Sequence, residues 1–172
     1  MFYKQLLSLL FILPPLLFSS CDENIKITLD TDKEPELPPI TMEGKQTFGC
    51  LLNGEVWVRS PTLFRSNLTG YYSSQLKMFF VQASIRHNGI LTSSITFSAN
   101  VDTLGTYDFK HLSHYTGLNF IREDFIIEEE DHFVEITHLD QNIISGLFHF
   151  SLLDTLSGDT LRFSKGRFDF SG

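Results

Sequence analysis

The chain has 172 residues, of which 42% are hydrophobic and 20% are charged, a composition typical of one globular domain and not of a disordered or fibrous protein. Its formal net charge of −8 and its pI near 5.1 disfavour binding to the phosphate backbone of nucleic acids. Two cysteines are too few for a disulfide framework or a closed zinc site.

Residues 1–20 have the layout of a secretory signal peptide. A basic start is followed by an apolar run that ends at Phe18, and small serines precede Cys21. The run is shorter than the roughly 20 residues that a membrane-spanning helix needs. It also contains Pro14 and Pro15, which remove helix hydrogen bonds. A signal peptide is therefore a better interpretation than a transmembrane anchor.

The segment Phe18-Ser19-Ser20-Cys21 resembles the lipobox of bacterial lipoproteins, in which the cysteine is acylated and becomes the first residue of the mature protein. Phe18 departs from that pattern, because Leu is the usual residue there. The resemblance implies that Cys21 is lipidated and that the protein is held on the outer membrane of the cell envelope, on its surface or periplasmic face. The alternative is a plain secretory signal followed by an incidental cysteine.

Residues 21–44 differ in composition from the rest of the chain. Acidic residues outnumber lysines there, and prolines disfavour regular secondary structure. Charge repulsion and proline extend such a segment, so we predict a lipidated cysteine followed by a disordered acidic tether. Residues 45–172 contain no proline after Pro61 and are predicted to form a single β domain, because β-ladders need their backbone N–H groups.

The first hairpin of this domain is predicted at Asn53-Gly54, a dipeptide typical of tight β-turns. Trp57 on its second strand lies opposite either Cys50 or Gly49, depending on the register. A second hairpin turns at Asn88-Gly89.

Two registers are conceivable for the second hairpin. A three-residue loop that includes His87 pairs Phe79 with Phe97 and collects the apolar side chains on one face. A two-residue turn pairs Val81 with Thr96 and mixes apolar and polar residues on both faces. The three-residue loop is therefore our prediction.

The C-terminal part of the chain predicts further strands. A two-residue turn at Lys165-Gly166 sets Arg162 opposite Asp169, a favourable cross-strand charge pair. The segment 144–152 alternates between apolar and polar residues and follows a turn at residues 140–142. Another strand with a bend is expected within 118–128. Together these patterns predict an all-β fold, an antiparallel β-sandwich or flattened barrel of about eight strands.

Tyr71, Tyr72 and Tyr115 are candidate ligand contacts, because aromatic rings can stack on sugar rings or on a partner protein. The three tyrosines lie in segments predicted to be loops. The alternative is that they pack at the edges of the sheets.

Thr103, Thr155 and Thr160 each stand in an Asp-Thr-Leu tripeptide. This tripeptide resembles the acceptor motif for O-linked glycans in exported proteins of the Bacteroidota, which makes the three threonines candidate O-glycosylation sites. The alternative is ordinary turn chemistry, since Asp and Thr are common at bends.

No catalytic or metal-ligating motif is recognisable, and we predict no cofactor and no metal. Cys50 lies in an apolar strand with no neighbouring base, so we expect a buried core residue. The acidic run 128–131 before His132 is expected to be a solvated loop and not a cation site.

The segments at residues 47–57 (TFGCLLNGEVW), 145–148 (SGLF) and 165–169 (KGRFD) resemble a family of uncharacterised lipoproteins of the Bacteroidota. The resemblance covers the chain from the signal to the C-terminus. It implies a lipid-anchored envelope protein with a β fold, and it transfers no catalytic residues.

We therefore expect a membrane-anchored envelope lipoprotein that acts as a non-enzymatic binding or adaptor module, with a glycan or an envelope protein as its partner and no nucleic acid. One alternative is a carrier of a small ligand or glycan in a barrel cavity. The other is a hydrolase, which would need His132, Glu135 and His149 to come together.

Overall fold

The computed structural model describes residues 36–59, 67–117, 119–122, 125–127 and 131–171. All of them belong to one compact unit, Glu34–Gly172. The predicted signal peptide, Cys21 and the first part of the tether lie outside the described residues. The described residues contain no helix that is long and apolar enough to cross a membrane.

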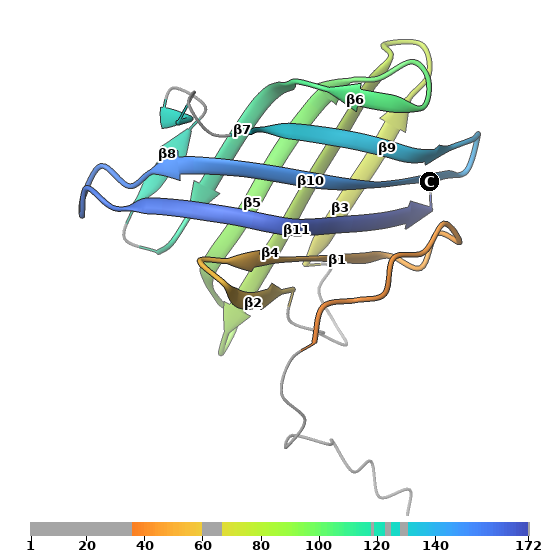
Figure 1. Cartoon of the computed structure of the whole chain (residues 1–172). Helices are drawn as coiled ribbons and strands as arrows, with labels where there is room; N and C mark the ends of the chain where they lie inside the picture. Colours follow the sequence, from red (N-terminus) through yellow and green to blue (C-terminus); the bar gives the residue numbers. More distant parts are fainter. Residues whose placement is uncertain (1–35, 60–66, 118, 123–124, 128–130, 172) are drawn as a thin grey trace, which may run out of the picture. The chain divides into compact units, whose positions relative to one another are not determined.

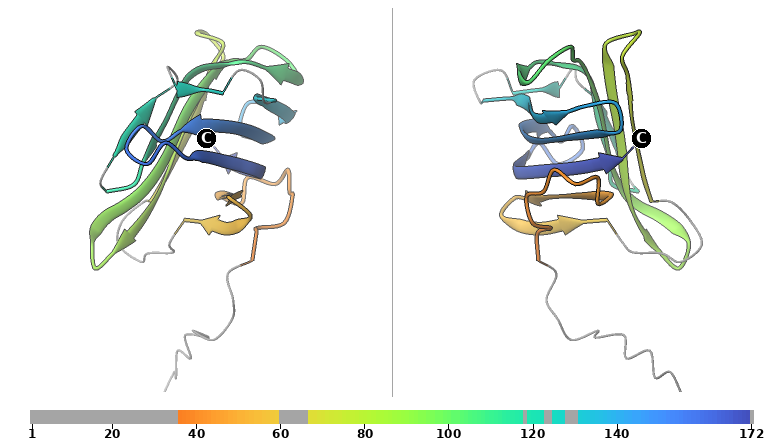
Figure 2. Two further views of the ribbon diagram at one scale, coloured as in Figure 1. Left: turned by 60° about the vertical axis from the view of Figure 1, so that its left-hand side comes forward. Right: turned by 90° about the vertical axis from the view of Figure 1, so that its right-hand side faces the viewer.

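The described residues form two antiparallel sheets that lie face to face, with their strands crossing at an angle (Figures 1 and 2). Sheet A has the order β2-β1-β11-β10-β9-β6. Its strands are β1 (Thr47–Leu52), β2 (Glu55–Val58), β6 (Gly105–Tyr107), β9 (Phe133–Leu139), β10 (Ile143–Leu153) and β11 (Thr160–Ser171). Sheet B has the order β3-β4-β5-β7-β8. Its strands are β3 (Leu68–Ser73), β4 (Met78–His87), β5 (Ile90–Asn100), β7 (Phe109–Tyr115) and β8 (Phe120–Arg122).

This arrangement confirms the predicted β-sandwich, and it is not the flattened barrel, because the two sheets remain separate. The space between the sheets is filled by phenylalanine rings, which are the largest of the fully buried side chains in the described residues. Phe79 of sheet B stacks on Phe168 of sheet A at 4.8 Å between ring centroids, and Phe150 stacks on Phe163 at 4.3 Å. The barrel cavity that the carrier alternative requires is therefore not formed by the described residues.

The hairpin at Asn53-Gly54 is confirmed, with Cys50 opposite Trp57. Strand β10 and the turn before it are also confirmed. The Asp140 carboxylate accepts hydrogen bonds from the N–H groups of Asn142 and Ile143, both at 2.7 Å, and so closes that turn.

The predicted loop of the second hairpin is wrong, although its apolar face is right. The turn has two residues, Asn88 and Gly89, whose φ angles of 50° and 79° are those of a type I′ turn. Thr92 then forms a β-bulge that shifts the register, so that Val81 lies opposite Phe97. The bulge allows a tight turn and an apolar inner face at the same time.

The predicted hairpin at Lys165-Gly166 is wrong, because β11 runs through this dipeptide as one strand. Lys165 has a φ of 50° and lies in an irregularity of the ladder with β10. The ring of Phe148 lies directly against Gly166, where a Cβ would overlap it. Gly166 is thus required by ring packing and not by a turn, and Arg162 does not face Asp169.

The sequence analysis does not predict strands β3, β6 and β7. Of the segment 118–128, the structure describes residues 119–122 and 125–127; they contain the short strand β8, and Ile126 makes an isolated bridge to Leu152. The missed strands β3 and β7 contain the three candidate tyrosines. These tyrosines therefore lie in strands, and their assignment to loops is wrong.

Residues 36–45, which we call the strap, lie against the outer face of sheet A before β1 begins (orange in Figure 1). Asp169 of β11 holds the strap and is only 1% exposed. Its carboxylate accepts hydrogen bonds from Thr41 Oγ1 (2.6 Å), Glu43 N (3.1 Å), Gly44 N (2.8 Å), Lys45 N (3.1 Å) and Ser145 Oγ (2.7 Å). The folded unit thus extends to the N-terminal side of the predicted boundary at residue 45.

Burial by itself would raise the pKa of Asp169. The hydrogen bonds from Thr41, Ser145 and the backbone N–H groups of the strap favour the ionised carboxylate more strongly, and they lower the pKa to about 2. Arg167 adds a contact at the other end of the strap, where its Nη1 donates to the carbonyl of Pro38 at 3.2 Å.

Candidate functional site

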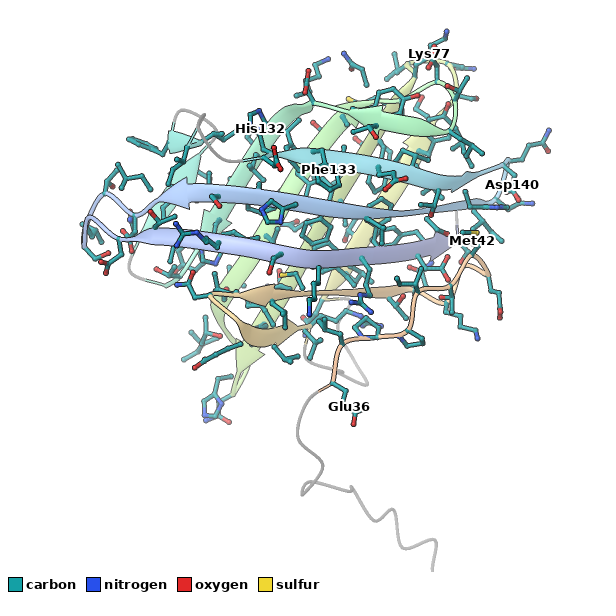
Figure 3. The ribbon with its side chains drawn as sticks, viewed as in Figure 1. Glu36, Met42, Lys77, His132, Phe133 and Asp140 are labelled. Carbon is teal, nitrogen blue, oxygen red and sulfur yellow. The ribbon has the colours of Figure 1, made fainter. Side chains whose placement is uncertain are left out.

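A groove lies between β3, at the edge of sheet B, and the turn that joins β9 to β10 in sheet A. Its open part has a volume of about 450 Å³ and is lined by Tyr72, Ser74, Leu139, Asp140 and Gln141. A narrow part of about 30 Å³ continues beside it and is lined by Gly70, Tyr71, Tyr72, Asp140, Gln141, Asn142, Ile143, Ile144 and Phe170. Because the two parts share residues, we treat them as one site, the β3 groove. Figure 3 labels Asp140 at the tip of the turn.

The β3 side of the groove is aromatic. Tyr72 points inward and packs against the phenylalanine core. Tyr71 points to the outer face of sheet B, where it is 45% exposed and stacks on Phe80 at 5.3 Å. Between the strands, the ring of Phe170 lies against Gly70, where a Cβ would come within 2.7 Å of it. This close approach brings β11 directly up to β3.

The side of the groove formed by the β9–β10 turn is polar. Hydrogen bonds from His138 and from the N–H groups of Asn142 and Ile143 lower the pKa of Asp140, so its carboxylate is ionised at neutral pH. Gln141 and Asn142 expose their side chains at the tip of the turn. The groove therefore sets an aromatic strand beside a carboxylate and two amides.

Of the three candidate tyrosines, Tyr71 and Tyr72 both line the β3 groove and Tyr115 does not. Tyr115 ends β7, opposite Ser94 on one side and Phe120 on the other. The β9–β10 turn, which forms the other side of the groove, lies far from the two tyrosines in the chain. The sequence therefore does not indicate that the turn and the tyrosines come together.

The three candidate glycosylation sites lie in different places. Thr103 is exposed between β5 and β6, and Thr155 is exposed in the turn between β10 and β11. Thr160 is half-buried as the first residue of β11. None of the three lines the β3 groove.

A buried polar chain crosses one part of the core and was not predicted. Trp57 Nε1 donates to Ser93 Oγ at 3.0 Å, and Ser93 Oγ lies 3.2 Å from His114 Nε2. His114 is 2% exposed, and its burial lowers the pKa to about 4 although Asp154 acts in the opposite direction. Because His114 and Trp57 are buried and Trp57 already donates to the serine oxygen, we interpret this chain of contacts as a structural link between the sheets and not as a catalytic dyad.

Two of the three residues of the hydrolase alternative, Glu135 and His149, lie on neighbouring strands of sheet A without pairing with each other. Glu135 lies opposite Leu147, and His149 lies opposite Phe133, on whose ring it stacks at 6.2 Å. In the described part of the chain no hydrogen bond connects Glu135 to His149. The geometry thus gives no support to Glu135 and His149 as a paired acid and base.

Cys50 is fully buried, and burial raises the pKa of its thiol to about 12, which is consistent with the expected core residue. Across the described residues there is no group of three or more His, Cys, Asp or Glu side chains that could hold a metal ion. Residues 128–130 of the acidic run lie outside the described residues.

Comparison with known proteins gives no match to a family model, to a curated protein or to a solved structure.

Proposed function

We propose that this protein is a membrane-anchored lipoprotein of the cell envelope that acts as a non-enzymatic binding or adaptor module, with the β3 groove as its ligand site. The observation that carries the proposal is the groove itself. It combines Tyr71 and Tyr72 of one sheet with the ionised Asp140 of the other, next to an open volume of about 450 Å³. An apolar wall with a few converging polar groups is typical of a binding site.

The N-terminal part of the proposal rests on the lipobox-like segment that ends at Cys21. A lipid on this residue would connect to the domain through the tether, and the strap attaches that end of the chain to β11 through Asp169. Mass spectrometry of the mature N-terminus tests this part. We expect an acylated Cys21 and no residue before it, and an unmodified thiol on a secreted protein would contradict the proposal.

Photo-cross-linking on intact cells tests the ligand site. A photoreactive side chain is placed at Gln141, which is exposed beside the groove. The matched control is Leu156, which is 68% exposed in the turn at the other end of β10. We expect a discrete cross-linked product from position 141 and none from position 156.

Two results would contradict the proposal that the groove binds a ligand. One is the absence of any product from position 141, and the other is the same set of products from both positions. The mass of the product distinguishes a glycan from a protein partner.

A further inference from the structure

At the outer edge of β3, the backbone groups of Gly70 and Tyr72 have no strand partner among the described residues. The N–H of Ser84 donates to the carbonyl of Asn67 at 2.8 Å, and hydrogen-bonded pairs recur at every second residue of an antiparallel ladder. Gly70 and Tyr72 fall between these pairs, so their N–H and C=O groups point away from β4 and towards the groove. No hydrogen bond reaches them from any described residue.

Among the edge strands that the described residues form, β3 is also the least protected. It has six residues, whereas β2 has four and β6 and β8 have three each. Exposed edges are usually protected by charged residues, by proline or by shortness. The sequence LTGYYS of β3 contains neither a charge nor a proline. An added strand would therefore meet a long uncharged edge.

We propose that β3 accepts an extended peptide of a partner protein as a sixth strand of sheet B. This inference rests on the proposed function, in which the β3 groove is the ligand site. In such strand addition, main-chain hydrogen bonds provide affinity, and pockets for alternate side chains provide specificity. The main-chain partners here are Gly70 and Tyr72, and the β3 groove is the pocket.

The groove also determines the chemistry of the peptide. The peptide side chains that point towards sheet A would contact Leu139 and Ile143. The peptide side chains on the outer face of sheet B would lie beside the stacked rings of Tyr71 and Phe80. The ionised Asp140 and the net charge of −8 repel acidic peptides. The expected ligand is thus a neutral or basic segment with apolar residues at alternate positions.

A second copy of this chain meets these requirements less well. Two copies carry the same negative charge, and the β9–β10 turn stands beside the edge that they would have to share (Figure 1). We therefore assign the edge to a partner peptide and treat self-association as an outcome of the test.

The test uses the mature full-length protein and a phage library of random nine-residue peptides. Three variants are compared with the unchanged protein. Tyr72→Pro removes both the ring and the outward N–H, and Tyr72→Ala removes only the ring. Val56→Pro removes an outward N–H on the distant edge strand β2. Proline is tolerated at edge positions whose N–H faces solvent, and thermal melts verify the fold of each variant.

We expect enriched peptides with alternating apolar residues and few acidic ones. They should bind the Tyr72→Pro variant about three- to tenfold more weakly than the Tyr72→Ala variant, because one backbone hydrogen bond is lost. Binding to the Val56→Pro variant should be unchanged. If the Tyr72→Pro variant does not fold, amide exchange in the unchanged protein decides the question: the peptide should protect the amides of Gly70 and Tyr72 but not that of Val56.

The inference is overturned if no peptide is enriched or if the two Tyr72 variants bind the enriched peptides equally well. It is also overturned if the peptide leaves the amides of Gly70 and Tyr72 unprotected, or if the protein dimerises through β3 without a peptide. A glycan cross-linked at Gln141 would overturn the inference that the ligand is a peptide, but it would leave the groove as the ligand site. The absence of any cross-linked product at that position would instead contradict the proposed function.

Discussion

Replacing Asp169 by Asn tests whether the buried carboxylate holds the strap to the fold. The side chain keeps its size, but it loses the negative charge that accepts the hydrogen bonds of Thr41, Ser145 and the strap backbone. The pKa of Asp169 falls from 3.8 to about 2, and a shift of this size corresponds to about 2 kcal/mol of stability at neutral pH. Asp169→Asn should therefore destabilise the protein by at least this amount, about 4–8 °C in Tm for a domain of this size.

The sign of the pH dependence follows from the lowered pKa. The carboxylate contributes its stabilisation fully above its unfolded pKa of 3.8, and the contribution is lost as the pH falls through the folded pKa of about 2. Urea titrations at pH 7, 5, 3 and 2 should show a constant difference between Asp169→Asn and the unchanged protein at the two higher values. The difference should shrink towards pH 2.

The exposed Asp159 provides the matched control, and Asp159→Asn should change stability by less than about 0.5 kcal/mol. The reasoning is refuted if Asp169→Asn costs no more than this control at pH 7, or if its cost is the same at pH 7 and at pH 2. Limited proteolysis gives a second measurement, since a released strap should be cut faster within residues 36–45.

Three further outcomes are expected. Gly166→Ala should destabilise the protein by about 1–3 kcal/mol in urea titrations, because the new methyl group overlaps a core ring; a neutral effect would contradict the packing role of this glycine. The free energy of unfolding should also fall by about 3 kcal/mol between pH 6.5 and pH 4, because His114 binds a proton in the unfolded state over this range but stays neutral when it is buried in the folded state. His114→Gln should remove this pH dependence. If the Asp-Thr-Leu tripeptides are glycosylated, peptide mass spectrometry should find glycans on the exposed Thr103 and Thr155 before the half-buried Thr160, and equal occupancy would argue against selection by exposure.

The parts of the fold that the sequence predicts correctly are those with local causes. The alternation in β10 reflects burial of every second side chain, and Asn53-Gly54 fits the positive φ angles of a two-residue turn. Lys165-Gly166 is the same kind of dipeptide, but there the glycine is needed because the ring of Phe148 packs directly against it. A local pattern cannot distinguish a glycine needed for a turn from one needed for space.

The candidate site depends on contacts that no local pattern records. Tyr71 and Tyr72 were identified from their residue type alone, and their strand was missed because its sequence lacks a clear alternation. Asp140 was identified only as part of a turn. The sequence does not reveal the role of Asp169 for the same reason, since its hydrogen-bond partners in the strap precede it by more than a hundred residues in the chain. Long-range pairing brings these groups together, and the sequence alone does not give it.

The strap also affects how the domain responds to a pull on its N-terminus. Asp169 lies on β11, which has β1 on one side and β10 on the other, so tension entering along the chain reaches an interior strand before it reaches β1. Peeling β1 away from its neighbour first requires several short hydrogen bonds to a single carboxylate to break together. A domain that is attached through its N-terminus would therefore resist unfolding by a force applied at that end.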